Sequence, residues 1–221
     1  MKVMLFNGSP RKDWNTALLL EAAARGARDA GAETELVGLG DLTFTGCRSC
    51  FACKRKGNRT NGVCAVEDSL RGILLRTMEA DAVIVGAPVY FDWLSGITQC
   101  FLERLLFPVT HYETGPDGKR LRTLPKEKRC GFIVTMNLGE EAMKGRGYDV
   151  KFGGVADRLG TVLGDRPAEL LYAFDTLQFD DYGRYEVNTF DPVKKAARRR
   201  EVFPEDLEKA YRMGQKLALR S

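Results

Sequence analysis

A nine-residue segment near the N-terminus, residues 8–16, carries groups suited to binding a phosphate. It follows a short apolar run and precedes a stretch with helical periodicity. The segment supplies two hydroxyls, one amide and two cations: Ser9, Thr16, Asn15, Arg11 and Lys12. Because the free N–H groups and the positive dipole end of a helix attract anions, this set predicts a phosphomonoester site. The alternative is that Ser9 and Asn15 only cap and turn the chain.

Two other phosphate-binding loops are excluded by the same residues. The segment has no G-x-G-x-x-G pattern, so it is not the loop of a dinucleotide-binding domain. It has no G-K-[ST] pattern either, which excludes a P-loop nucleotidase.

A second group of reactive residues is formed by four of the six cysteines, Cys47, Cys50, Cys53 and Cys64, within eighteen residues. Thiolates at intervals of three residues converge readily on one metal cluster. Three interpretations stay open: a [4Fe–4S] cluster, a zinc ion held by four thiolates, and free thiols whose first three members pack on one helical face. Cys100 and Cys130 are expected to be ordinary core residues.

The elements that must position these residues alternate along the chain. The predicted strands are residues 2–6, 34–39, 81–86, 130–135 and 169–174, and the predicted helices are 16–30, 68–79, 94–106, 150–163 and 205–219. This alternation predicts an α/β fold with a doubly wound five-stranded parallel sheet in three layers, α/β/α. Ligands of such sheets bind beyond the carboxyl ends of the strands, where the winding direction switches.

Two further loops therefore face the predicted phosphate segment. Residues 86–91 follow the third strand, which is apolar throughout and belongs in the middle of the sheet. Their Pro88, Val89, Tyr90 and Phe91 suit the wall of a flat aromatic ring, although these aromatic residues are also compatible with plain core packing. The loop after the fourth strand brings Asn137 to the same edge by topology.

Composition sets the remaining expectations. With 221 residues, 44% of them apolar and 29% charged, the chain is expected to form one globular domain over residues 1–221. A Cys-rich insertion at about 40–67 and an exposed excursion at about 109–129, which holds His111, interrupt it, and residues 175–202 read as polar and irregular. No apolar run is long enough for a membrane span and no secretory signal pattern is present, so a cytoplasmic location is expected.

Charge gives little indication of a partner. The net charge of +4 does not favour nucleic-acid binding. The basic run of Lys194, Lys195 and Arg198 to Arg200 is expected to be a solvated face or a mobile loop, with an anionic partner as the alternative.

The motif G-S-P-R-K-x-x-N-T, together with G-A-P-V-Y-F at residues 86–91, resembles the NAD(P)H-dependent FMN reductases, which are flavodoxin-like. The chain is most similar to their iron–sulfur flavoprotein branch, over roughly residues 1–108. The resemblance implies that Ser9, Arg11, Asn15 and Thr16 hold the FMN phosphate. It also implies that residues 86–91 line the isoalloxazine ring. Trp14 departs from the glycine common in the family.

For the cysteines, the resemblance implies a [4Fe–4S] cluster beside FMN, although the ten-residue gap before Cys64 is longer than usual. For activity, it implies electron transfer from NAD(P)H to a quinone, flavin or protein acceptor by a homodimer or homotetramer. The alternative is a non-enzymatic FMN and iron–sulfur electron-transfer protein or a flavin redox sensor.

Overall fold

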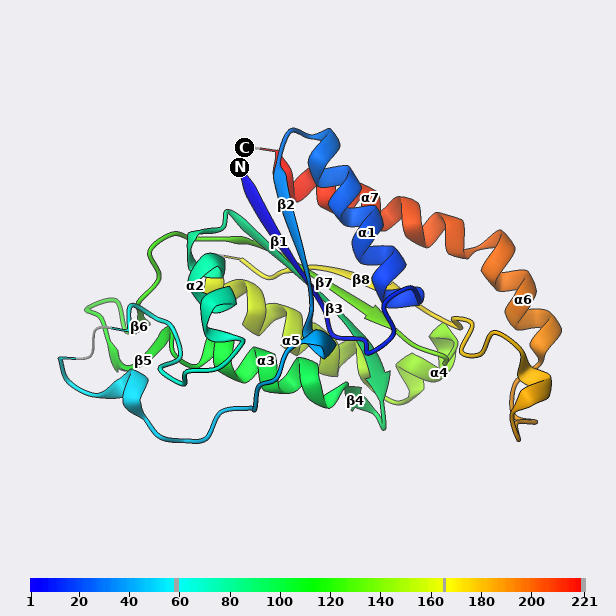
Figure 1. The fold of residues 1–221 in the computed structure, drawn as a ribbon, viewed down its shortest axis with the longest axis horizontal. Helices are drawn as coiled ribbons and strands as arrows, with labels where there is room; N and C mark the ends of the chain where they lie inside the picture. Colours follow the sequence, from blue (N-terminus) through cyan, green and yellow to red (C-terminus); the bar gives the residue numbers. More distant parts are fainter. Residues whose placement is uncertain (58–59, 165, 220–221) are drawn as a thin grey trace.

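A central parallel sheet organises the structure, a computed structural model that describes residues 1–57, 60–164 and 166–219. Its five parallel strands run in the order β2-β1-β3-β7-β8 (Figure 1). Their bounds are β1 Lys2–Asn7, β2 Glu33–Gly38, β3 Ala82–Tyr90, β7 Arg129–Thr135 and β8 Glu169–Ala173. The order reverses direction between β1 and β3, which is the flavodoxin-like arrangement expected from the sequence.

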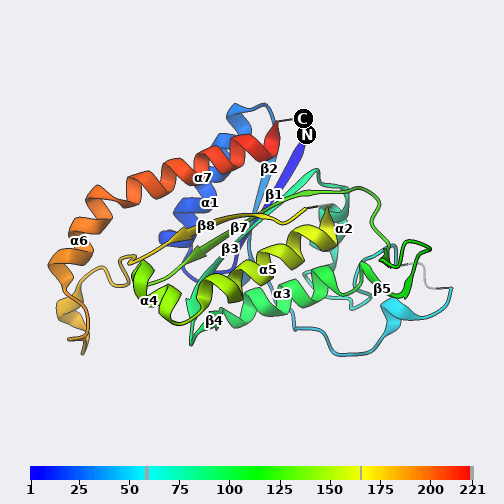
Figure 2. The same ribbon diagram turned by 180° about the vertical axis from the view of Figure 1, so that it is seen from behind.

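Helices cover both faces of the sheet, as the views from opposite sides show (Figures 1 and 2). One face carries α1 (Asn15–Asp29) and α7 (Phe203–Ala218), and the other carries α2 (Arg71–Glu79), α3 (Gly96–Leu106) and α5 (Tyr148–Leu163). A separate hydrophobic core fills each side of the sheet. None of the described helices is long and apolar enough to cross a bilayer.

The contact between α1 and α7 depends on small residues. A Cβ atom added at Gly214 of α7 would lie 1.9 Å from the backbone oxygen of Ala23 in α1. A Cβ atom added at Gly26 of α1 would lie 2.0 Å from the backbone oxygen of Tyr211. The two helix backbones therefore approach each other directly, which fixes the position of α1 and of the loop that precedes it.

The third strand is longer than its sequence predicts. β3 continues through Tyr90 and then pairs with the antiparallel β4 (Trp93–Leu94). The expected loop after Gly86 is therefore wrong, since Gly86 to Pro88 pair with β7 along its last three residues. Extended conformation suits the residue before a proline, and the Pro88 nitrogen has no hydrogen to donate.

Two helices occur where none was expected. The short α4 (Glu140–Gly145) precedes α5, and α6 (Pro192–Glu201) lies within the segment predicted to be irregular. The start of α6 has a local cause: the Asp191 carboxylate accepts hydrogen bonds from the N–H groups of Val193 and Lys194, and Pro192 occupies the first turn.

The remaining elements are short. The excursion forms an exposed hairpin of β5 (Thr110–Thr114) and β6 (Arg120–Arg122), closed by a turn at residues 115–118. Within the part of the chain that the structure describes, 3₁₀ turns are formed by Leu39–Asp41, Ala52–Lys54 and Tyr182–Arg184. The helix predicted from residue 68 begins later, at Arg71, and the Asp68 carboxylate accepts a hydrogen bond from the Leu70 N–H at 3.1 Å just before it.

Candidate functional site

Hydrogen bonds within the loop after β1 determine its shape. The Asn7 side chain accepts from the Ser9 N–H at 3.0 Å, and the Ser9 hydroxyl accepts from the Arg11 N–H at 3.2 Å. Gly8 lies against α3, where an added Cβ would come within 1.8 Å of the Thr98 hydroxyl oxygen. Ser9 is buried, and its hydroxyl helps to hold the loop in shape in addition to its predicted role in binding phosphate.

The first turn of α1 offers open backbone donors at the end of this loop. Trp14, at the N-cap, makes no side-chain cap hydrogen bond. The N–H groups of Asn15, Thr16 and Ala17 belong to the first turn of α1, so they have no partner inside the helix. Thr16 is buried, and its hydroxyl is 2.8 Å from that of Thr135 at the end of β7. An anion placed here meets several donors and the positive end of the helix dipole.

The strap, residues 175–178, crosses from the loop after β7 to the loop after β1. At one end the Asp175 N–H donates to the Leu138 oxygen at 2.8 Å. At the other end, Trp14 and Asn15 both donate to the Leu177 oxygen, at 2.9 and 2.8 Å. The strap was not predicted from the sequence, because its partners at the start of α1 lie more than 160 positions away along the chain.

The strap forms hydrogen bonds with two of the predicted phosphate ligands, Arg11 and Asn15. Arg11 donates through Nη1 to the Gln178 oxygen at 2.6 Å, and its guanidinium lies over the Trp14 ring. Asn15 donates to the strap and accepts from Arg199, so both ends of its amide are engaged. Lys12 points away to pair with Asp41 and is largely exposed. Each of these three side chains therefore already has a protein partner, whereas the backbone N–H groups in the first turn of α1 have none inside the helix.

An exposed aromatic turn stands beside the loop, at the end of β3. Phe91 and Asp92 form a two-residue turn, and both have left-handed backbone angles, with φ of +47° and +61°. The Phe91 side chain is fully exposed at 106% relative accessibility, while Tyr90 and Trp93 are partly exposed. A bulky residue in this conformation carries strain, which occurs disproportionately at binding and active sites.

Polar contacts hold this strained turn in place. The Asp92 carboxylate accepts a hydrogen bond from the Tyr148 hydroxyl and one from Arg146 at 3.2 Å. The Tyr148 hydrogen bond, followed by the nearby cations, lowers the pKa of Asp92. Lys151 donates to the Asp92 backbone oxygen at 2.9 Å. The aromatic shelf, defined here as Tyr90, Phe91 and Trp93, is thus anchored to α5.

Asn137 completes the edge with an unused acceptor. Its Nδ2 donates to Gln178 at 2.6 Å, and its backbone oxygen accepts from Lys195 at 2.7 Å. Within the described residues, its buried Oδ1 has no hydrogen-bond partner. Such an orphaned acceptor is costly unless a ligand or water donates to it. The open donors of α1, the orphaned oxygen and the aromatic shelf together fit a phosphorylated flavin.

The insertion that carries the four clustered cysteines runs along α3 toward β5 and β6 (Figures 1 and 2). All four line one small hollow, in which Cys47 and Cys50 are exposed and Cys64 is buried. Burial raises the pKa of the Cys53 thiol, and the neighbouring Cys64 and Cys47 act in the same direction, while Lys54 opposes them. Residues 58 and 59 of the insertion lie outside the described residues.

The thiols surround the hollow without forming a ligand set. Across residues 1–57, 60–164 and 166–219, no three His, Cys, Asp or Glu side chains are grouped as a metal would require. The predicted helical face is wrong, because Cys47 and Cys50 lie in irregular chain. Ser49, between these two cysteines, and Phe51, directly after Cys50, have left-handed φ angles of +52°. Cys130 is buried as expected, and Cys100 is partly exposed.

A buried arginine ties the insertion to α3. Arg104 donates to the backbone oxygens of Thr45 and Val66, both at 3.2 Å, and forms a two-point ion pair with Asp68. Burial alone lowers the pKa of Arg104, but the Asp68 carboxylate and the Cys64 sulfur outweigh it, and the net shift is upward. This buried charged pair is therefore one of the contacts that hold the cysteine hollow against α3.

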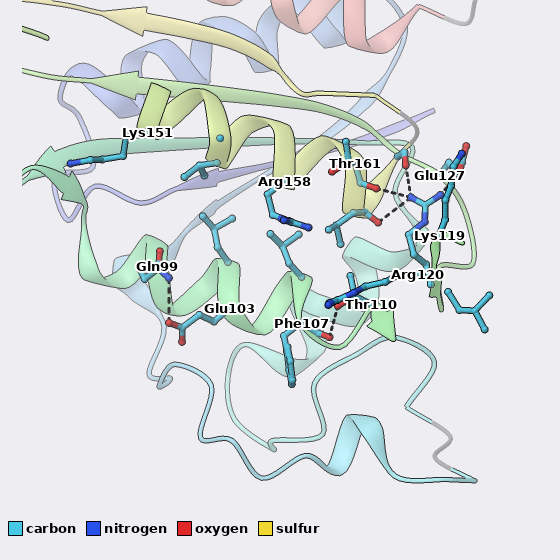
Figure 3. A pocket seen from close by; sticks show the side chains of 18 of the residues that line it. Gln99, Glu103, Phe107, Thr110, Lys119, Arg120, Glu127, Lys151, Arg158 and Thr161 are labelled. Atoms are coloured by element: carbon cyan, nitrogen blue, oxygen red, sulfur yellow. Dashed lines mark hydrogen bonds and ion pairs between the residues drawn. The ribbon is translucent and has the colours of Figure 1, made fainter. Parts of the chain in front are cut away.

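A larger cavity of about 1180 Å³ separates α3 from α5 and reaches the β5–β6 hairpin (Figure 3). Its walls include Trp93, Glu103, Phe107 and Arg158. None of the residues predicted to bind a cofactor lines it. His111 lies on β5, where its Nε2 is 2.6 Å from the Thr123 hydroxyl.

A known protein family matches the part of the chain that forms the loops at the carboxyl ends of β1 and β3. Residues 1–122 match the family model of the NADPH-dependent FMN reductases. The chain belongs to the NADPH-dependent FMN reductase family. The matched residues include both the loop after β1 and the aromatic shelf, but not the strap or α6.

Individual relatives agree with this assignment. An iron-sulfur flavoprotein of Methanocaldococcus jannaschii is 36% identical over 104 residues, which are 47% of this chain and 51% of the relative. One of Archaeoglobus fulgidus is also 36% identical over 104 residues, 47% of this chain and 48% of the relative. The chain thus spans about half the length of the curated relatives it matches.

Solved structures share the fold across nearly the whole chain. An NAD(P)H:quinone oxidoreductase from Methanothermobacter marburgensis has a TM-score of 0.67 at 17% identity, covering 98% of each chain. An FMN-dependent NADH-azoreductase from Bacillus anthracis, in complex with FMN, has a TM-score of 0.65 at 12% identity, covering 99% of this chain and 100% of its own. At these identities the likeness establishes the flavodoxin-like fold alone.

Proposed function

We propose that the chain binds FMN at the carboxyl edge of its sheet and acts as an oxidoreductase that passes electrons from NAD(P)H to a quinone, flavin or protein acceptor. The observation that carries this proposal is the open first turn of α1 inside the segment that matches the FMN reductase family. A helix start without a cap, at the switch point of a doubly wound sheet, is suited to a phosphate.

The chain's own residues divide the work of binding. The N–H groups of Asn15, Thr16 and Ala17 would donate to the phosphate, with the Ser9 and Thr16 hydroxyls beside them. Pro88 and Val89 would line the ring together with the aromatic shelf. The orphaned Oδ1 of Asn137 would accept a hydrogen bond from a ring N–H, which removes the cost of its burial.

Bound FMN supplies the two-electron chemistry, and the chain controls access to it. The partly exposed Tyr90 offers an aromatic surface on which a nicotinamide or a quinone would stack. The anchoring of Asp92 by Tyr148 and Arg146 keeps that surface in one position. No acid–base group of the chain is assigned.

The proposed electron transfer does not depend on a metal cluster, because the four thiols do not form a ligand set as they are arranged. Metal analysis distinguishes the open interpretations. Iron and sulfide in anaerobically purified protein support a [4Fe–4S] cluster, and zinc supports a four-thiolate site. The absence of both supports free thiols.

We also propose that copies of the chain associate through the aromatic shelf. A fully exposed phenylalanine in a strained turn beside the cavity between α3 and α5 is apolar surface that a second copy would cover. Light scattering after gel filtration tests this proposal. The wild type is expected to be a dimer or tetramer, and Phe91→Asn, which tolerates the turn, is expected to shift toward monomer. A monomeric wild type contradicts it.

Purified protein loaded with FMN and mixed anaerobically with NADH or NADPH tests the enzymatic proposal. Loss of the oxidised flavin absorbance, followed by steady nicotinamide oxidation when a quinone is added, supports a reductase. Bound FMN that neither nicotinamide reduces, but that reduced ferredoxin reduces reversibly, contradicts the reductase and supports an electron carrier.

A further inference from the structure

Helix α6, which precedes the last helix α7, brings a cation to the start of α1, at the end of the loop after β1. The sequence predicted that the basic run would be solvated or mobile, and that prediction is wrong for most of it. Lys195 is buried at 3% relative accessibility and contacts Asn137 and Asp175, and Arg198 pairs with the buried Asp206. Arg199 lies between these anchors and α1, and it donates from Nη1 to Asn15 Oδ1 at 2.9 Å.

Arg199 differs from its neighbours because it has no counter-ion. Arg198 pairs with Asp206 and Arg200 with Glu201, but among the described residues no carboxylate pairs with Arg199. Its guanidinium lies 4.1 Å from the centroid of the Phe203 ring and is partly buried. Burial and then the neighbouring Arg198 lower the pKa of Arg199. One hydrogen bond to Asn15 leaves most of its five N–H donors unused.

This placement opposes the electrostatics of the protein alone. Asn15 is the first residue of α1, so Arg199 stands at the positive end of that helix dipole. Arg11, in the loop before the helix, adds a further positive charge and contacts Gln178, next to the strap residue Leu177 that Asn15 contacts. The acidic residue of that loop, Asp13, is exposed and forms no ion pair with Arg199. A doubly negative phosphate bound at this point relieves the repulsion and uses the free donors.

We propose that Arg199 is a phosphate-binding residue of the FMN site, supplied by the C-terminal part of the chain, and that it makes the site selective for the phosphorylated flavin over riboflavin. The proposal rests on the proposed FMN binding at this edge. It extends the site beyond the residues of the family match, which ends at position 122.

Charge removal with the side-chain amide retained gives the sharpest test. Arg199→Gln preserves a donor for Asn15, and Arg200→Gln is the matched control on the same helix. The dissociation constants of FMN and riboflavin are measured by quenching of flavin fluorescence, and thermal unfolding is recorded without flavin. Because hydrogen bonds to charged groups contribute about 1.5–3 kcal/mol, Arg199→Gln is expected to weaken FMN binding roughly 10- to 100-fold. Riboflavin binding and the unfolding temperature without flavin are expected to stay unchanged.

Equal weakening of FMN and riboflavin, or a lowered unfolding temperature without flavin, overturns the proposal and assigns Arg199 a purely structural role. Arg199→Lys keeps the charge, and it is expected to recover part of the lost FMN affinity. If the wild type binds FMN and Arg199→Gln binds it equally well, only the role of Arg199 fails. If the wild type binds no FMN, the proposed function itself fails.

Discussion

The ion pair between Asp68 and Arg104 is expected to control both the stability of the chain and the position of the cysteine insertion. The Arg104 side chain is fully buried, and that of Asp68 is 17% exposed. Asp68→Ala leaves the guanidinium charge buried without a carboxylate, with two backbone oxygens and the Cys64 sulfur as its remaining partners. Removing one partner of such a pair costs about 3–5 kcal/mol, since the remaining charge stays desolvated.

Urea unfolding of the wild type and of Asp68→Ala at neutral pH measures this loss in the free energy of unfolding. The matched control is Glu67→Ala, because Glu67 is the adjacent acid and pairs with Arg71 on the surface, where its side chain is 78% exposed. A surface pair of this kind contributes about 0.3–0.5 kcal/mol. The free energy of unfolding is therefore expected to fall several times further for Asp68→Ala than for Glu67→Ala. Equal losses in the two variants would refute the reasoning.

Three further outcomes follow from the structure. Gly214→Ala is expected to lower the free energy of unfolding by about 1–3 kcal/mol, because its Cβ meets the Ala23 backbone oxygen. The control Gly153→Ala has open space and is expected to keep or gain about 0.5–1 kcal/mol in the same urea titration. Burial lowers the pKa of Lys128 from 10.5 to about 8. At pH values between these two, Lys128 is therefore mostly protonated in the unfolded chain and mostly deprotonated in the folded chain. Stability of the wild type, relative to Lys128→Met, is expected to rise as pH increases from about 8 to 10.5; a flat difference contradicts this. At acid pH, the stability of the folded chain is expected to depend on Asp68, whose pKa is lowered by Arg104 against the effect of burial. Its contribution is present above the ordinary value of 3.8 and is lost as pH falls through the lower folded value, a loss that Asp68→Ala should not show.

Local patterns in the sequence were sufficient to predict the sheet. The uninterrupted apolar run from Ala82 to Val85 indicated a central strand, and β3 occupies the middle of the sheet with β1 and β7 on its two sides. Gly8 and the polar residues after it indicated the first loop. Both depend on periodicity and turn chemistry over a few residues, which a single sequence displays directly.

The parts that were missed depend on contacts between distant positions. Tyr90 was assigned to a loop because nothing local indicates its pairing with Trp93 across a strained turn. The Asp191-Pro192 pair did carry a local helix-start signal, and it predicts α6 when read with the capping rules. By contrast, the approach of Arg199 to Asn15 spans 184 positions and follows from the packing of α6 and α7.

Amide chemical shifts of the folded protein test most directly whether a phosphate binds at the start of α1. In a two-dimensional NMR spectrum, added FMN and inorganic phosphate are both expected to move the N–H resonances of Asn15, Thr16 and Ala17, while riboflavin moves only those near the aromatic shelf. If saturating FMN leaves these three resonances in place while the protein remains folded, the FMN site is not at this edge.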